Sequence, residues 1–216
     1  MGPLSSAQLQ FLLNGLGWTV ALSLLAFAGG GLLGFVVALA RAYGKPALRR
    51  GVGLYIQLIQ GTPLLVLLSL AYFGLPGLGF NVQPLTAAAL GLSLYVSATI
   101  GEIWRGCLEA VPRTQVEAAE CLGLNRWQRL GHVILPQAAR IATPLTVGFM
   151  VQIVKNTSLA SAIGFVELAR AGQVINNSTF QPFVVFTGVA ALYFAVCFPL
   201  SAWSRRLEAR FRVSHR

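Results

Sequence analysis

Five long apolar stretches constrain this chain more than any other feature of its sequence. They cover about residues 16–40, 52–73, 84–104, 141–163 and 182–203. A helix needs about 20 apolar residues to cross the hydrocarbon core of a bilayer, and in a helix the backbone satisfies its own hydrogen bonds, which lipid cannot do. Only 10% of the 216 residues are charged, against about 25% in soluble domains. We therefore predict one all-α, polytopic membrane domain of five transmembrane helices over residues 1–216.

The basic residues predict how these helices are oriented. Fourteen of the sixteen Lys and Arg residues lie in three segments that fall on one side of such a domain. The segments are residues 41–50, residues 105–140 and the tail at residues 205–216. Connections rich in Lys and Arg remain in the cytoplasm. We therefore expect the N-terminus outside and the C-terminus inside, and we interpret the net charge of +10 as a topology signal, not a nucleic-acid footprint.

The sequence offers little that a catalytic or metal site would use. Cys107, Cys121 and Cys197 lie far apart without a CxxC spacing, so we expect ordinary small apolar residues and no disulfide framework. Asp is absent, and His132 and His215 have no catalytic neighbours, so we expect them to be solvated. No GxxxxGK[ST] phosphate-binding pattern occurs. We predict no catalytic residue, no metal and no cofactor, and any ATP hydrolysis would need another polypeptide.

The connection between the third and fourth spans carries helix signals of its own. Thr114 and Glu117 have the spacing of a capping box, which predicts a helix start. Gly123 stands where a left-handed C-terminal cap would end that helix. Asn125, with Gln128 three residues later, predicts a second helix start. The connection runs from about Arg105 to Arg140, which is far longer than the roughly 2–8 residues that join packed helices. Its length and its helix signals suggest a role beyond joining the two spans.

The short helix in this connection is built to be approached closely. Ala118, Ala119 and Gly123 carry little or no side chain, so another protein's surface can reach the backbone. Glu117 and Glu120 supply polar anchors beside them. The alternative is a helix that packs only on its own membrane domain.

This pattern resembles a known motif. EAA at residues 117–119, G at 123 and VILP at 133–136 are similar to the EAA motif of ATP-binding-cassette (ABC) importer permeases, with valine at 133 where that family usually has isoleucine. In that family the loop, here residues 113–136, forms a coupling helix that sits in a groove of the cytoplasmic ATPase subunit. The resemblance implies that four residues couple the chain to the ATPase: Glu117, Ala118, Ala119 and Gly123.

Three further stretches resemble permeases for polar amino acids: YIQLIQGTPLL at residues 55–65, GEIWRG at 101–106 and KNTSL at 155–159. The resemblance spans about residues 13–211. Many relatives have aspartate where this chain has Asn156, so the motif does not name the amino acid carried. The resemblance implies ABC ATPase subunits, a second permease subunit (as a homodimer or a heterodimer), an extracytoplasmic substrate-binding protein, a polar amino-acid substrate, and a place in the lipid of the bacterial cytoplasmic membrane.

Two polar interruptions of the apolar spans are candidates for the substrate pathway. The sequence Gly61-Thr62-Pro63 lies near the middle of the second span, where proline bends a helix; it is either a packing kink or part of the pathway. Lys155 lies in the fourth span, within the hydrocarbon depth or near its outer edge, where a charge is usually paired or functional. It can pair with an acid of another span or subunit, snorkel to the headgroups, or attract a substrate carboxylate. The candidate pathway residues are Gly61, Thr62, Lys155, Asn156, Thr157 and Ser158.

Two other groups of charged residues have predicted roles. Glu102 and Arg105 are three residues apart on one helix face, which favours a structural or gating pair over substrate contact. The last external connection, residues 165–181, contains Glu167 and Arg170 among apolar residues. We expect a short surface helix there, which either meets the binding protein, as the resemblance implies, or lies at the membrane interface.

The leading prediction is therefore an ABC importer permease that performs no covalent chemistry. The main alternative is an autonomous ion-coupled carrier, with Lys155 and Glu102 as its coupling charges, which inverted internal repeats would favour. The sequence shows no such repeats. A membrane-embedded enzyme would need a cluster of His, Asp and Glu that the chain does not provide.

Overall fold

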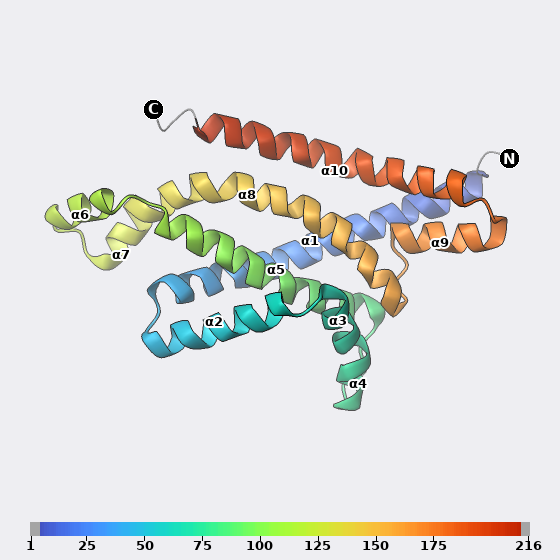
Figure 1. Ribbon diagram of the computed structural model, residues 1–216, viewed down its shortest axis with the longest axis horizontal. Coiled ribbons are helices and arrows are strands. Elements are labelled where there is room, and N and C mark those ends of the chain that lie inside the picture. The colour runs from blue at the N-terminus through green and yellow to red at the C-terminus, as the bar shows by residue number, and fades with distance from the viewer. Residues whose placement is uncertain (1–4, 213–216) are drawn as a thin grey trace.

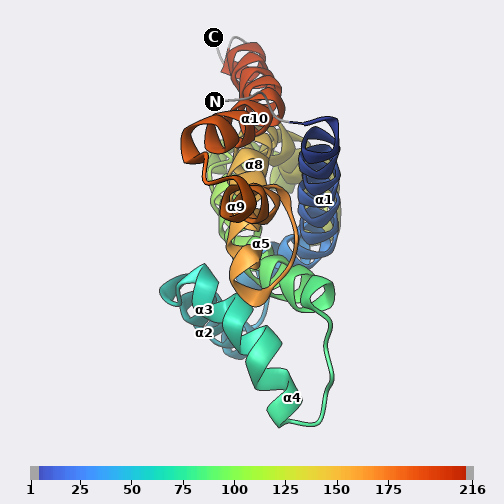
Figure 2. The ribbon, with the colours of Figure 1, turned by 90° about the vertical axis from the view of Figure 1, so that its right-hand side faces the viewer.

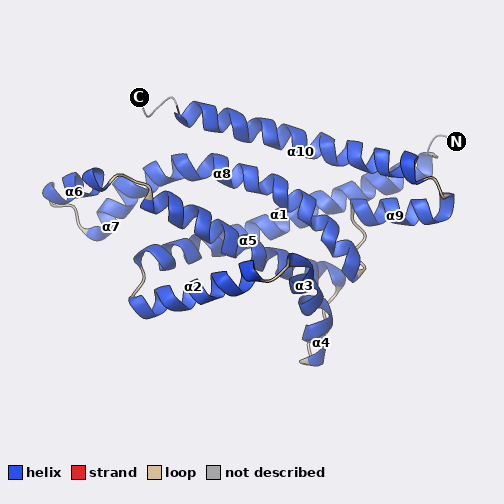
Figure 3. Ribbon diagram, viewed as in Figure 1, coloured by secondary structure: helices blue, strands red, loops and turns tan. Residues whose placement is uncertain are grey.

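The computed structural model describes residues 5–212, and each regular element in that range is helical (Figure 3). Long helices lie side by side along the longest axis of the molecule (Figure 1). They are α1 (Ser6–Tyr43), α5 (Pro84–Glu109), α8 (Leu135–Asn156) and α10 (Pro182–Arg212). Helix α5 lies between α1 and α8, and α8 packs against α10. The predicted all-α fold is confirmed.

Shorter helical elements connect or extend the long ones. The α-helical elements are α2 (Pro46–Gly61), α3 (Leu64–Ser69), α4 (Leu75–Gly77), α6 (Arg113–Cys121), α7 (Arg126–Gln128) and α9 (Leu168–Thr179). The others are two π-helical segments, Leu70–Gly74 and Arg129–Ile134, and a 3₁₀ segment, Thr157–Ile163. Because α7, the second π-helical segment, α8 and the 3₁₀ segment follow without a break, they form one long helical rod from Arg126 to Ile163.

The predicted membrane helices are present, with one important difference. Within residues 5–212, four helices are long and apolar enough to cross a membrane, and α2 with the α3–α4 segment makes a fifth candidate that is bent by 100°. We predicted one kinked helix over residues 52–73. The structure has two separate helical segments there, with a sharp break between them. Figure 2 shows α4 projecting from the body of the molecule.

The break in the second span has a local cause. Pro63 has no backbone N–H, and Thr62 adopts an extended conformation (φ −103°, ψ 130°) that ends α2. The Thr62 hydroxyl donates to the carbonyl of Leu58 at 2.7 Å, so it replaces the backbone donor that this carbonyl would have in a continuous helix. The break is thus built into the sequence.

Glycines set the close contact between α1 and α5. A Cβ atom at Gly30 would lie 2.5 Å from the Cβ atom of Val96 and 2.6 Å from the carbonyl oxygen of Ser93. Val96 belongs to the main core cluster, together with Leu22 of α1. Only a residue without a side chain allows the two helices to pack at this distance.

We expect Gly30→Ala to destabilise the fold by about 1–3 kcal/mol, because the added methyl group forces two packed helices apart. The matched control is Gly31→Ala, where a Cβ atom would meet nothing within 4 Å. Thermal unfolding of the detergent-solubilised chain measures both. Equal melting temperatures for the two variants would contradict this account of the α1–α5 contact.

The first two basic segments and the third as far as Arg212 gather at one end of the bundle, which we call the basic end. Figure 1 shows the α1–α2 connection, the α6–α7 loop and the end of α10 together on the left, while α9 and the start of α1 lie on the right. The segments that we predicted to share one side of the membrane therefore do share one end of the molecule.

Candidate functional site

Helices α6 and α7 form a hairpin at the basic end, which we call the coupling loop (residues 113–136). Its turn is made by Gly123, whose φ of +76° is left-handed. The N–H of Leu124 donates to the carbonyl of Ala119 at 3.2 Å, and the N–H of Gly123 donates to that of Glu120 at 2.9 Å. These two bonds form a Schellman closure. The predicted C-terminal cap at Gly123 is confirmed.

The two predicted helix starts have different outcomes. At Asn125 the side-chain oxygen accepts the N–H of Gln128 at 3.0 Å and the Gln128 side chain accepts the N–H of Asn125 at 2.9 Å, so this capping box is confirmed. The capping box at Thr114 was wrong, because α6 starts at Arg113 directly after Pro112 and has no side-chain cap. Pro112 itself occupies the N-cap position, with an extended ψ of 132°, so Thr114 lies inside the first turn.

Polar contacts hold the coupling loop firmly on the membrane domain. Arg129 and Glu120 form an ion pair at 2.7 Å, which joins the two arms of the hairpin. The guanidinium of Arg126 donates to the carbonyl of Tyr43 at 2.6 Å and lies 5.6 Å from the centre of the Tyr43 ring. The loop is thereby attached to the end of α1. Sequence reasoning missed this contact, because a bond to a backbone carbonyl 83 residues away leaves no local signal.

The outer face of the coupling loop is bare. Glu117, Ala118 and Gly123 are exposed, as are Leu122 (80%) and Trp127 (74%). Among residues 5–212, Glu117 has no hydrogen bond or ion pair. Within the described residues, the outer face of the loop thus combines an acid without a partner with two large, exposed apolar side chains.

Ala119 differs from the other three predicted coupling residues. It is only 4% exposed, and its carbonyl accepts the N–H of Leu124 in the turn at Gly123. We predicted that its small side chain lets a partner approach. In this conformation the side chain of Ala119 is buried, and its role in coupling stays a prediction.

Lys155 lies at the end of α8 with its side chain exposed. It has no ion pair with any acid in the part of the chain that the structure describes, so of the three predicted roles, pairing within this chain is not found. Next to it, the Asn156 side chain accepts the Gln152 amide at 3.2 Å. Thr157 is fully buried and Ser158 is half-buried, and the hydroxyls of both donate to backbone carbonyls.

The two predicted pathway segments lie close to each other. Helix α3, which follows the break at Gly61-Thr62-Pro63, packs against the 3₁₀ segment that follows Asn156. Leu64 and Leu68 of α3 share a buried cluster with Ala160. Gly61 is exposed, and a Cβ atom there would meet nothing within 4 Å. The broken second span and the end of the fourth thus border one region.

Glu102 and Arg105 form the predicted pair on α5. Arg105 donates to the Glu102 carboxylate at 2.8 Å, and both side chains are partly exposed, at 28% and 29%. Arg105 also forms an ion pair with Glu109 at 2.5 Å. We did not predict this pair, although its i,i+4 spacing favours it. All three residues lie on one helix, so the cluster stabilises α5 near the basic end, and its role in gating stays a prediction.

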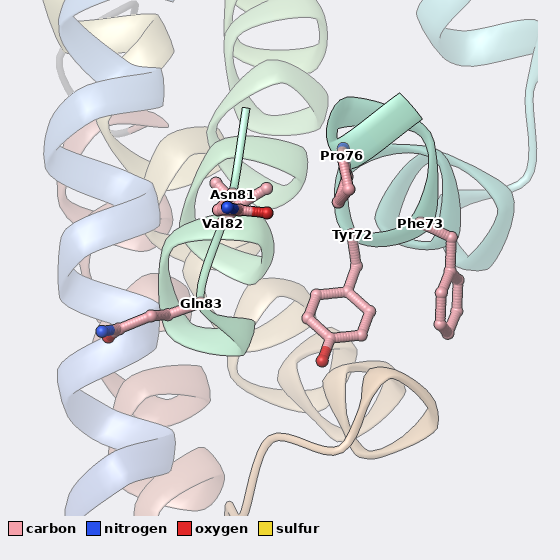
Figure 4. A pocket seen from close by; sticks show the side chains of 6 residues that line it. All are labelled: Tyr72, Phe73, Pro76, Asn81, Val82 and Gln83. Carbon is pink, nitrogen blue, oxygen red and sulfur yellow. The ribbon is translucent and has the colours of Figure 1, made fainter. Parts of the chain in front are cut away.

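An open pocket of about 550 Å³ lies between the end of the broken second span and the loop that leads to α5 (Figure 4). One wall carries the rings of Tyr72 and Phe73 and the other carries the loop with Asn81 and Gln83. None of the predicted pathway residues lines this pocket.

The cysteines and histidines have no site-forming neighbours in the described part of the chain. Cys107 and Cys197 are buried, Cys121 is exposed, and all three are free thiols. His132 is exposed, with its Nδ1 atom 3.1 Å from the carbonyl of Gln128. His215 lies outside the described residues.

The external helix predicted over residues 165–181 is present as α9, but its leading acid was misplaced. Glu167 is not a surface residue. It is 0% exposed and caps the N-terminus of α9.

Comparisons of the sequence with known proteins agree with this geometry. The family described as "binding-protein-dependent transport system inner membrane component" matches residues 30–213. The probable amino-acid ABC transporter permease protein YckA of Bacillus subtilis is 34% identical over 201 residues, which cover 93% of this chain and 89% of that protein. The glutamine transport system permease protein GlnP of Escherichia coli is 34% identical over 208 residues, which cover 95% and 94%.

Solved structures give the same result. A chain from the crystal structure of an amino acid ABC transporter with histidines has a TM-score of 0.88 and 33% identity, and the match covers 93% of this chain and 94% of that one. A chain of the inward-facing MetNI methionine ABC transporter has a TM-score of 0.83 at 19% identity, with 99% and 100% covered, and this shows a shared fold. These relatives favour the ABC permease prediction over the ion-coupled carrier. The protein is a multi-pass permease of the inner membrane, and it belongs to the family of inner membrane components of binding-protein-dependent transport systems.

Proposed function

We propose that this chain forms half of the translocation path of an ABC importer for polar amino acids, and that its coupling loop receives the motion of a separate ATPase subunit. The observation that carries the proposal is the exposed outer face of the coupling loop, whose inner side contacts the membrane domain. Glu117 has no partner within residues 5–212, and Leu122 and Trp127 are 80% and 74% exposed. The substrate class rests on relatives named for amino acids and for glutamine.

The proposed assembly follows from the two ends of the bundle. The basic end faces the cytoplasm, because Lys and Arg in short connections are retained there. Two ATPase subunits bind at this end, and an extracytoplasmic binding protein binds at the end that carries α9 (Figure 1). Five spans are few for a complete translocation path. Because oligomers most often have two-fold symmetry, a second permease subunit, either identical or related, supplies the other half of the path.

The contacts of the coupling loop suggest how the motion is passed on. ATP binding closes the ATPase pair and moves α6. The loop is tied to α1 by the contact of Arg126 with Tyr43, and its apolar side packs with Cys107 of α5 and Ala138 of α8 in one buried cluster. Movement of the loop therefore displaces three spans together. The loaded binding protein shifts the balance only if it binds one conformation more tightly than the other.

Reconstitution into vesicles tests this function. We expect uptake of a polar amino acid only when the permease, the ATPase, the binding protein and ATP are all present. Omission of ATP or of the ATPase is expected to abolish uptake. Uptake by this chain alone, driven by an ion gradient, would overturn the proposal and restore the ion-coupled carrier.

A further inference from the structure

Glu167 is the one charged residue among residues 5–212 whose side chain is completely buried, with 0% exposure. An ionised carboxylate away from water costs several kcal/mol unless hydrogen-bond donors or charges surround it. No Lys or Arg of the described chain lies within ion-pair distance of it. Its environment must therefore supply neutral donors.

Four donors surround this carboxylate, and they come from three helices. The backbone N–H groups of Ala169 and Arg170 donate at 2.9 and 2.8 Å, at the positive end of the α9 helix dipole. From α10, the Tyr193 hydroxyl donates at 2.8 Å. From α1, the Thr19 hydroxyl lies at 3.5 Å, and the same hydroxyl oxygen accepts the N–H of Leu168 at 3.1 Å.

The surrounding packing closes these three helices around the carboxylate. A Cβ atom at Gly15 of α1 would lie 3.0 Å from the Cβ atom of Ala171 in α9. A Cβ atom at Gly172 of α9 would lie 2.6 Å from a methyl group of Val189 in α10. Helix α9 is thus clamped between α1 and α10, unlike a loosely attached interfacial helix.

The network also reaches the helix that carries Lys155. Tyr193 packs against a buried cluster in which Cys197 of α10 meets Val151 and Val154, in the last turns of α8. One carboxylate therefore links an external helix, through a single tyrosine, to the segment that we predict to line the pathway.

We propose that Glu167 is a positioning residue that fixes α9 to α1 and α10, and that this anchor is needed for a loaded binding protein at the external end to stimulate ATP hydrolysis at the basic end. The stimulation part rests on the function proposed above. The anchoring part rests on the contacts of the chain itself.

Hydrogen–deuterium exchange on the membrane-embedded permease tests the anchor without any transport. Tyr193→Phe removes one hydroxyl and keeps the ring, so the protein is expected to fold. The amides of α9 are expected to exchange at least tenfold faster in this variant, while those of α5 stay unchanged. The control is Tyr55→Phe, which removes a hydroxyl bonded to Ser97 between α2 and α5 and is expected to leave α9 unchanged. Unaltered exchange of α9 in Tyr193→Phe would overturn the anchor.

The complete transporter tests the second part. In Tyr193→Phe and Glu167→Gln, we expect basal ATP hydrolysis within twofold of wild type and stimulation by the loaded binding protein reduced at least tenfold. A parallel loss of basal and stimulated hydrolysis, or full stimulation in both variants, would overturn the positioning role. Failure of the wild-type complex to take up amino acid with ATP would instead count against the proposed function, and the exchange experiment would still decide the anchor.

Discussion

Glu117→Lys is expected to abolish ATP-driven uptake while the permease stays folded. Glu117 is exposed and unpaired within residues 5–212, so its replacement changes the free energy of unfolding by no more than about 0.5 kcal/mol. At a docked surface the reversed charge meets groups that were arranged for a carboxylate, and such mismatches cost several kcal/mol. Even about 2 kcal/mol weakens binding of the ATPase roughly 30-fold. Co-purification of the ATPase and the ratio of amino acid transported to ATP hydrolysed measure the effect.

Gln115→Lys is the matched control for this variant. It adds a positive charge to the same exposed helix, about 200° around the helix axis from Glu117. We expect it to retain the ATPase and its coupling. If both variants behave like wild type, α6 is only a packing element. If both lose the ATPase, the charge of the whole loop matters and the specific face defined by Glu117 does not.

The features that could be predicted from sequence are those with a local physical cause. Long apolar runs determine the membrane helices, because lipid requires about 20 such residues in a row. Pro63 has no backbone N–H with which to continue α2, and Gly123 accepts the left-handed turn that other residues resist. Asn125 satisfies backbone donors only two and three residues away. Each of these signals lies within a few residues of its effect.

The features that escaped prediction depend on residues far apart in the chain. Nothing near Glu167 indicates that it is buried, because Thr19 and Tyr193 arrive from two other helices. The attachment of Arg126 to Tyr43 is equally remote. The error at Thr114 has a local cause. Pro112 takes the N-cap position, so the helix begins at Arg113, before the capping box that we predicted. The sharpness of the break after Gly61 is also a tertiary result, since α3 turns to pack on the 3₁₀ segment at the end of α8.

Lys155→Ala is expected to reduce uptake at least tenfold while assembly with the ATPase and basal ATP hydrolysis are retained. Lys155 is exposed and forms no ion pair within the described chain, so its removal leaves no buried charge without a partner. A substrate carboxylate that loses an ammonium partner loses about 1.5–3 kcal/mol of binding free energy, which is roughly 10- to 150-fold in affinity. Concentration-dependent uptake of radiolabelled amino acid measures the loss.

Lys45→Ala is the natural control, because Lys45 is the other lysine of the chain and is exposed at the start of α2 at the basic end. We expect it to transport normally. The three roles of Lys155 then separate by outcome. Normal uptake by Lys155→Ala would mean that the lysine snorkels to the headgroups. Loss of the second permease subunit would mean that it pairs with an acid of that subunit. Loss of uptake from an intact complex, restored in part by Lys155→Arg, would place its charge beside the substrate, since a guanidinium also attracts a carboxylate but does so with a wider, planar group.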